Sequence, residues 1–85
     1  MKVRLTPHAE EQIVFRKLSR ERVIEVSANP DQLTPAAAGR SFAQSRYTEG
    51  GKEYLLRVLI EDIGDERWVV TVYPTSKIRK YWKGS

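Results

Sequence analysis

The stretch KEYLLRVLIE, residues 52–61, has the pattern of a central β-strand. Alternation over residues 53–60 places apolar side chains on both faces of a β-strand. A strand that is apolar on both faces is covered on both sides, so we expect this one at the centre of a sheet. The two faces consist of Tyr54, Leu56, Val58 and Ile60 on one side, and of Leu55, Arg57 and Leu59 on the other.

Turn signals on both sides of this strand predict hairpins. Residues 49–52, Glu-Gly-Gly-Lys, favour a tight turn, and the weakly alternating residues 40–48 precede it with Phe42 and Gln44 on one side. Residues 62–65 predict a second turn, after which residues 67–73 return as a strand. With a short strand over residues 2–5, the pattern predicts a mostly antiparallel sheet of about four strands.

The N-terminal third has helical patterning. Thr6 and Pro7 form a helix start, with threonine as the N-cap and proline in the first helical position. A helix is expected from about residue 7 to residue 18, with an apolar stripe of Ala9, Ile13, Val14 and Leu18.

A second helix is predicted to start at the Ser19 cap and to stop before Pro30. Its core residues are expected to be Val23, Ile24 and Val26, and residues 29–39 are predicted to be a connecting loop. The predicted fold class is therefore α+β, a single domain over residues 1–85 with two helices packed on the sheet.

Composition narrows the possible partners. Fifteen Lys and Arg residues against eleven Asp and Glu give a net charge of +4, which favours an anionic partner such as nucleic acid. The chain has no cysteine, so disulfides and thiolate metal sites are excluded. Nothing resembles a signal peptide or a membrane span, so we expect a cytoplasmic protein without membrane contact.

His8 is the strongest single candidate for a catalytic residue. It is the only histidine and lies at the second position of the first predicted helix, where the positive end of the helix dipole favours a neutral, proton-accepting imidazole. The other interpretation is that His8 is a partly exposed residue of the first helical turn with no functional role. Arg16 lies eight residues further on, about 80° round the helix, and could face the same sheet edge or simply cover core residues. No metal or cofactor motif is present, so we predict neither.

Arg57 interrupts an apolar strand, where a guanidinium is costly without a partner or an open cleft. Two interpretations stay open: a buried ion pair with Glu25 or Glu61, or a residue that faces a ligand. An odd hairpin loop would place Thr71 opposite Arg57 with Tyr73 diagonal to it on the same face, and an even loop would swap the faces.

The closing stretch TVYPTSKIRKYW, residues 71–82, changes from strand to a short basic helical turn. Pro74 is expected to end the strand, and Thr75 or Ser76 to cap the turn. Ile78 and Trp82 are spaced to pack back on the sheet. The cations at this end of the chain are expected either to form an outer face that attracts phosphate or to be no more than a solvated, solubilising chain end: Lys77, Arg79, Lys80 and Lys83.

The runs TPHAEEQIVFRKLSRERVIEVSANP, KEYLLRVLIE and TVYPTSKIRKYW together resemble the family known as domain of unknown function 4258. The resemblance covers nearly the whole chain and includes the Thr-Pro-His-Ala helix start and the Thr-Val-Tyr-x-Thr-Ser-Lys run. The family usually has an arginine and a glycine where this chain has Lys17 and Leu18. Members are similar to small RelE-like toxins and other metal-independent ribonucleases with helices against a four-stranded antiparallel sheet.

The resemblance implies an RNA-cleaving protein of a toxin-antitoxin type, with RNA and a cognate antitoxin or other protein as partners, acting as a monomer or small homo-oligomer. The alternative is a non-catalytic RNA-binding or protein-interaction module of the same fold. The predicted catalytic residues are His8, Arg57, Tyr73 and Lys77. The predicted substrate-binding residues are Arg16, Thr71 and Lys80, with Tyr81 stacking on a base.

Overall fold

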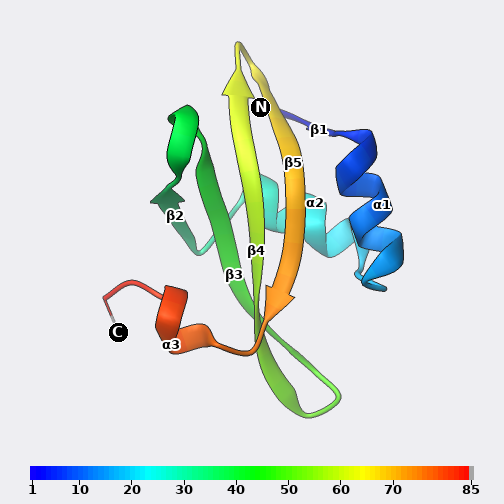
Figure 1. Ribbon diagram of the computed structural model, residues 1–85, viewed down its shortest axis with the longest axis vertical. Coiled ribbons are helices and arrows are strands. Elements are labelled where there is room, and N and C mark those ends of the chain that lie inside the picture. The colour runs from blue at the N-terminus through cyan, green and yellow to red at the C-terminus, as the bar shows by residue number, and fades with distance from the viewer. Residues whose placement is uncertain (85) are drawn as a thin grey trace.

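One five-stranded sheet, with two helices on one face, makes up most of the molecule (Figure 1). The computed structural model describes residues 1–84. Its elements in chain order are β1 Lys2–Leu5, α1 Pro7–Phe15, α2 Arg20–Ala28, β2 Gln32–Pro35, the 3-10 turn η1 Ala37–Gly39, β3 Ser41–Glu49, β4 Lys52–Ile63, β5 Glu66–Thr75 and α3 Ile78–Tyr81.

The strand order is β1-β5-β4-β3-β2, which confirms the α+β class and the central position of β4. The pairs are antiparallel except that β1 runs parallel to β5. The sheet thus has five strands rather than about four. The extra strand, β2, lies within residues 29–39, which were expected to be a loop. Its four residues include a proline and show no alternation long enough to predict a strand.

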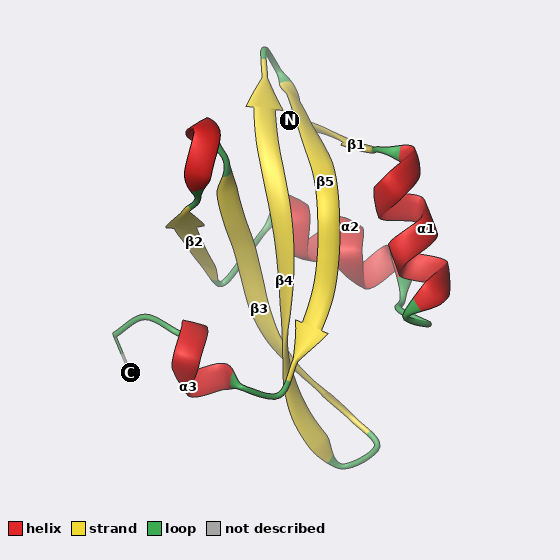
Figure 2. Cartoon of the chain, in the orientation of Figure 1, coloured by secondary structure: helices red, strands yellow, loops and turns green. Residues whose placement is uncertain are grey.

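Helices α1 and α2 cover one face of the sheet, as the secondary-structure view also shows (Figure 2). Their buried side chains are packed against the face of β4 that carries Leu56, Val58 and Ile60. The helix residues in this core are Ala9 and Ile13 from α1, and Val23 and Val26 from α2.

None of the helices within residues 1–84 has the length and apolarity needed to cross a bilayer.

The first helix is shorter than its pattern predicts. It ends at Phe15, because Lys17 adopts a left-handed conformation with φ 55°. The amides of Lys17 and Leu18 then donate to the carbonyls of Val14 and Ile13, which closes the helix as a Schellman motif and packs Leu18 on the core. Val14 was expected in the core but is 77% exposed, because one residue of helix turns it 100° away from Ile13.

A β-bulge sets the register of the last hairpin. The loop between β4 and β5 has two residues, Gly64 and Asp65, which alone would place Arg57 opposite Val72. Val70 has no partner on β4, however, and this extra residue shifts the pairing by one. Tyr73 therefore lies directly opposite Arg57, and Thr71 shares that face. Neither loop-length alternative anticipated this arrangement.

The strand β5 continues through Pro74 to Thr75, so the prediction that Pro74 ends it is wrong. Pairing with β1 stops at Val69, and beyond it one side of β5 has no neighbouring strand. A proline whose nitrogen faces that side costs no ladder hydrogen bond. The basic turn α3 follows, but its N-cap is Lys77, whose backbone amide donates to the Thr75 hydroxyl.

Candidate functional site: a polar row across the open face of the sheet

Four side chains lie in one row across the face of the sheet opposite α1 and α2. The strand registers place Gln32 opposite Gln44, Gln44 opposite Arg57, and Arg57 opposite Tyr73. The row therefore spans β2, β3, β4 and β5. Side chains directly opposite each other on neighbouring strands are close enough to contact, and here each one hydrogen-bonds the next. We call this set the polar row.

Arg57 is at the centre of the polar row and is only 7% exposed. Its Nε donates to Gln44 Oε1 at 2.9 Å, and its Nη1 donates to the Tyr73 hydroxyl at 2.7 Å. Its other terminal nitrogen, Nη2, has no hydrogen-bond partner within residues 1–84. Every fully buried side-chain nitrogen or oxygen in that part of the chain has a hydrogen-bond partner. Because Nη2 has none, it is not fully buried and reaches solvent.

The ion-pair interpretation of Arg57 is wrong. Glu61 accepts instead from Arg40 at 2.8 Å, and Glu25 accepts from the Asn29 amide at 3.4 Å. No carboxylate within residues 1–84 forms a salt bridge with Arg57. The positive charge at the centre of the open face is thus held by neutral groups alone, which leaves it available to an anion.

Aromatic rings enclose the Arg57 guanidinium. Its carbon lies 3.9 Å from the ring centroid of Phe42 and 4.1 Å from that of Tyr81, with Tyr73 at 5.8 Å. Such contacts stabilise a cation without neutralising it. Tyr81 was predicted to stack on a base, but one side of its ring contacts Arg57. The Tyr73 hydroxyl lowers the pKa of the Tyr81 phenol, and the charges of Lys80 and Arg57 lower it further.

The polar row also holds the C-terminal segment, which we define as residues 77–84. Gln44, fully buried, donates from Nε2 to the Tyr81 carbonyl at 3.0 Å and to Gln32 Oε1 at 2.8 Å. Gln32 in turn donates to the Lys83 carbonyl and accepts from the Lys83 amide. The segment crosses the open face beside β3 (Figure 1) because two glutamines supply the hydrogen bonds that a neighbouring strand would supply.

His8 reaches the same face at the edge of β5. Its Nε2 lies 3.2 Å from the Thr71 hydroxyl, within hydrogen-bond distance. The bulge positions it: the Thr6 hydroxyl caps α1 by accepting from the Ala9 amide and also donates to the carbonyl of the bulged Val70. The first turn of α1 is therefore attached beside Thr71, two residues before Tyr73 and about 7 Å from it along the strand.

The structure brings some of the predicted site residues together and leaves others apart. His8 contacts Thr71, and Arg57 contacts Tyr73 and Tyr81. Lys80 joins this group through its ammonium, which lies 5.4 Å from the Tyr81 ring.

Arg16 lies apart from the open-face site. Its Nε donates to Gln12 in its own helix, and eight residues of helix, about 12 Å, separate it from His8. Lys77 is exposed, and no side-chain hydrogen bond or ion pair within residues 1–84 connects it to Arg57 or His8.

Three residues of the site were not predicted: Gln32, Gln44 and Phe42. The alternation over residues 40–48 does place Phe42 and Gln44 on one side of a strand, which was the available signal. It could not show that this side faces Arg57, because the bulge and β2 were both missed. A buried glutamine beside a buried arginine becomes recognisable only when the register is known.

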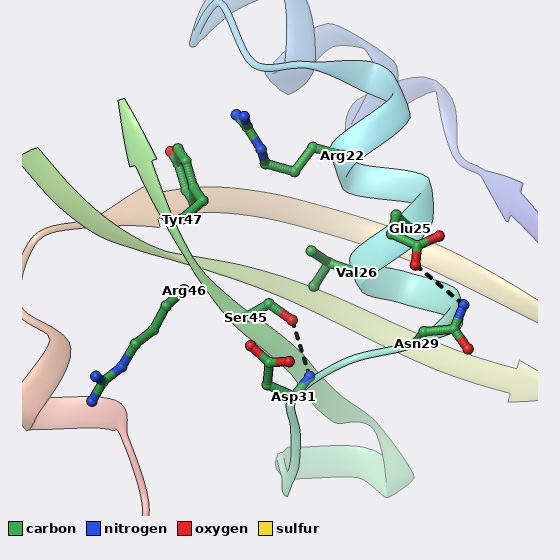
Figure 3. Close-up of a pocket in the computed structure, with 8 residues that line it drawn as sticks. All are labelled: Arg22, Glu25, Val26, Asn29, Asp31, Ser45, Arg46 and Tyr47. Atoms are coloured by element: carbon green, nitrogen blue, oxygen red, sulfur yellow. Dashed lines mark hydrogen bonds between the residues drawn. The ribbon is translucent and has the colours of Figure 1, made fainter. Parts of the chain in front are cut away.

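A separate pocket of about 270 Å³ lies on the other face of the sheet, between α2 and β3 (Figure 3). Ser45 accepts from the Asp31 amide there, and Glu25 is hydrogen-bonded to Asn29. Figure 3 shows Arg46 turned away from this pocket, toward the C-terminal segment, where its guanidinium lies 4.4 Å from the Trp82 ring. None of the predicted site residues lines the pocket.

Metal ligands are not grouped in the described part of the chain: nowhere in residues 1–84 do three His, Asp or Glu side chains cluster as a metal site requires. The groups at the open face can instead bind anions and move protons. Comparisons with known protein families, with curated proteins and with solved structures find no match to this chain.

Proposed function

We propose that the protein binds single-stranded RNA across the open face of its sheet and cleaves it without a metal ion. One observation carries the proposal. An imidazole, His8, and an unneutralised guanidinium, Arg57, contact residues Thr71 and Tyr73 of the same strand on the same face. A proton-transfer group and a fixed positive charge are the two elements that phosphodiester cleavage by an internal hydroxyl requires.

The proposed reaction is transfer of the phosphate to the neighbouring 2′-hydroxyl. His8 takes the proton from the 2′-hydroxyl, whose oxygen bonds to phosphorus while the bond from phosphorus to the 5′ oxygen breaks. Arg57 Nη2, which reaches solvent, meets the negative charge that develops on the phosphate oxygens. The departing 5′ oxygen takes a proton from Tyr73 or Lys77, and the other product ends in a 2′,3′-cyclic phosphate.

The surroundings of the polar row suit a polyanion. Lys80 is exposed beside the Tyr81 ring, and the exposed Lys77, Arg79 and Lys83 extend the positive charge along the C-terminal segment. Exposed lysines supply most of the affinity for a phosphate backbone without reading its sequence. The resemblance of the sequence to domain of unknown function 4258, whose members are similar to RelE-like toxins, favours the same class of activity, with a cognate antitoxin as the protein partner.

A second candidate is a non-catalytic module that binds RNA or a protein. The observation in its favour is the enclosure of Arg57, which is only 7% exposed and contacts two rings closely. A guanidinium held this firmly also serves to fix the C-terminal segment on the sheet. In this function the same cations bind phosphate, and His8 merely hydrogen-bonds Thr71.

The two functions are separated by incubating the purified protein with a short single-stranded RNA in EDTA and analysing the product ends. If the protein cleaves the RNA as proposed, the fragments should end in a 2′,3′-cyclic phosphate. An RNA with one 2′-deoxynucleotide should resist cutting at that position alone, because the attacking hydroxyl is missing. Intact RNA that is nevertheless bound would support the non-catalytic RNA-binding module. RNA neither bound nor cut would exclude both RNA functions and leave only the module that binds a protein.

A further inference from the structure

The C-terminal segment lies over Arg57, yet few contacts attach it to the sheet. None of its residues is buried, and its helix α3 is a single turn without a side-chain cap. Three hydrogen bonds attach its far end, and all three are made by the side chains of Gln32 and Gln44 rather than by a backbone ladder. Segments with few buried contacts open locally at a much lower free-energy cost than core strands do.

The charges of the C-terminal segment do not hold it in place. Its four Lys and Arg residues form no ion pair within residues 1–84. The segment instead lies against two arginines of the sheet. The Tyr81 ring lies 4.1 Å from the Arg57 guanidinium and 5.4 Å from the Lys80 ammonium. The Trp82 ring lies 4.4 Å from the guanidinium of Arg46. Positive charges thus crowd this contact, and an anion bound among them would relieve their repulsion.

Part of the cover over Arg57 belongs to the C-terminal segment. Two rings contact the guanidinium closely, Phe42 at 3.9 Å and Tyr81 at 4.1 Å. Phe42 belongs to the paired strand β3, whereas Tyr81 belongs to the weakly attached segment. When the segment moves away, Gln44 and Tyr73 still hold Arg57 from the sheet, and one side of its guanidinium becomes accessible.

We propose that the C-terminal segment is a lid on the anion site, and that a phosphate group that binds Arg57 displaces it. Under the function proposed above, on which this inference rests, the phosphate belongs to RNA. Only the open fraction of the protein binds the phosphate, so the closed lid lowers the apparent affinity by that fraction. The segment stays tethered through the exposed Ser76, and its cations remain near the bound polyanion.

Hydrogen exchange of the full chain tests the opening without any ligand. The Trp82 amide donates to the Ile78 carbonyl at 2.8 Å, and a single helical turn that leaves the sheet does not keep such a bond. Exchange at Trp82 should be at least about 100-fold faster than at the paired amides of β4. Gln32→Leu removes both hydrogen bonds to Lys83 and should speed exchange at Trp82 about tenfold further. Leu33→Ala is the matched control on the same strand. That side chain is 53% exposed on the other face of the sheet, so exchange should not change.

Inorganic pyrophosphate is the probe for the anion site. In Gln32→Leu, its affinity should rise by the same factor as the exchange rate at Trp82, because both quantities report the open fraction. Tyr81→Ala removes the cover directly, leaves the polar row intact and should also bind pyrophosphate more tightly than the parent. Saturating pyrophosphate should speed exchange at Trp82 in the parent protein. Unchanged affinity in both variants, or exchange at Trp82 that pyrophosphate slows, would overturn the lid.

RNA binding separates the lid from the function on which it rests. If RNA binds to the parent and to Gln32→Leu with the same affinity, the lid is wrong and RNA binding stands. If the pyrophosphate results hold but RNA is neither bound nor cut, the lid stands and the RNA function is wrong.

Discussion

At the scale of single residues, Gln44 determines how Arg57 can act. It accepts from the Arg57 Nε and donates to Gln32 and to the Tyr81 carbonyl, while fully buried. An amide is the only neutral side chain of this size that both accepts and donates twice. A carboxylate here would neutralise the guanidinium, so the choice of glutamine keeps the charge of Arg57 available.

Gln44→Leu should lower the free energy of unfolding by about 2 to 4 kcal/mol, because it leaves a buried charged donor without its acceptor. The chain contains a matched control. Gln12 accepts a hydrogen bond from the Arg16 Nε at 2.8 Å, close to the 2.9 Å between Gln44 and the Arg57 Nε, but this bond lies on the surface. Gln12→Leu should cost less than about 0.5 kcal/mol. Equal losses in urea unfolding of the two variants would show that burial of the Gln44 contact adds nothing.

Gln44→Glu separates charge from packing at the same position. The carboxylate keeps an acceptor for Arg57 but neutralises the charge and cannot donate to Gln32 or Tyr81. We therefore expect weaker RNA binding than in the parent, whatever the change in stability. RNA affinity equal to that of the parent, measured on a variant that is shown to be folded, would mean that the charge of Arg57 does not contact phosphate.

At the scale of elements, the bulge at Val70 connects the register of the sheet to the position of α1. The extra residue brings Tyr73 opposite Arg57, and its carbonyl accepts from the Thr6 hydroxyl. One local irregularity thus places both proposed reactive groups, His8 and Arg57, on the same face. Bulges commonly redirect side chains beside functional sites in this way.

Thr6→Ala should destabilise the protein more than removal of an ordinary helix cap does. It deletes the cap of α1 and also the bond to the bulge, for an expected loss of about 1.5 to 3 kcal/mol. Ser19→Ala is the matched control, because Ser19 caps α2 by accepting from the Arg22 amide and makes no second side-chain bond within residues 1–84. Its loss should be about 1 kcal/mol. Chemical denaturation that gives the same loss for both variants would contradict the anchoring role of Thr6.

The elements themselves were largely predictable from the sequence, and their connections were not. The helix starts at Pro7 and after Ser19, the turn at Gly50 and Gly51 and the central β4 all follow from local capping, turn chemistry and alternation. The strand β2 and the bulge depend on pairing between strands, which local pattern does not encode. The Schellman end of α1 is local, but Lys17 takes the left-handed position that glycine usually holds, so residue type gave no signal for it. The site shows the same division: His8 and Arg57 stand out by residue type, whereas Gln32 and Gln44 depend on register.

At the scale of the whole molecule, the two faces of the sheet have different compositions. One face is apolar and covered by α1 and α2. The other carries the polar row, aromatic rings and the basic C-terminal segment. A chain of 85 residues buries a small core, so burying polar side chains in it costs a large share of its stability. A function on the open face would explain why the polar row is there.

Binding to single-stranded RNA should fall steeply with salt. The logarithm of the association constant should decrease against the logarithm of salt concentration with a slope of roughly −0.7 for each phosphate contacted. Lys77→Gln combined with Lys80→Gln should flatten the slope by about 1 to 1.5, since two cations are lost. Arg16→Gln is the control, because Arg16 lies at the far end of α1 and bonds Gln12. A slope that is unchanged in the double variant would remove these lysines from the binding surface.

The most direct test of the account is the rate at which folded His8→Ala cleaves a single-stranded RNA in EDTA, compared with the parent protein. His8 is exposed, so the substitution should leave the thermal melt nearly unchanged. Loss of a positioned proton-transfer group should slow cleavage by on the order of 10² to 10⁴, while RNA affinity stays within about threefold. Cleavage by His8→Ala at the rate of the parent, or a parent that leaves the RNA intact, would contradict the proposed catalytic site.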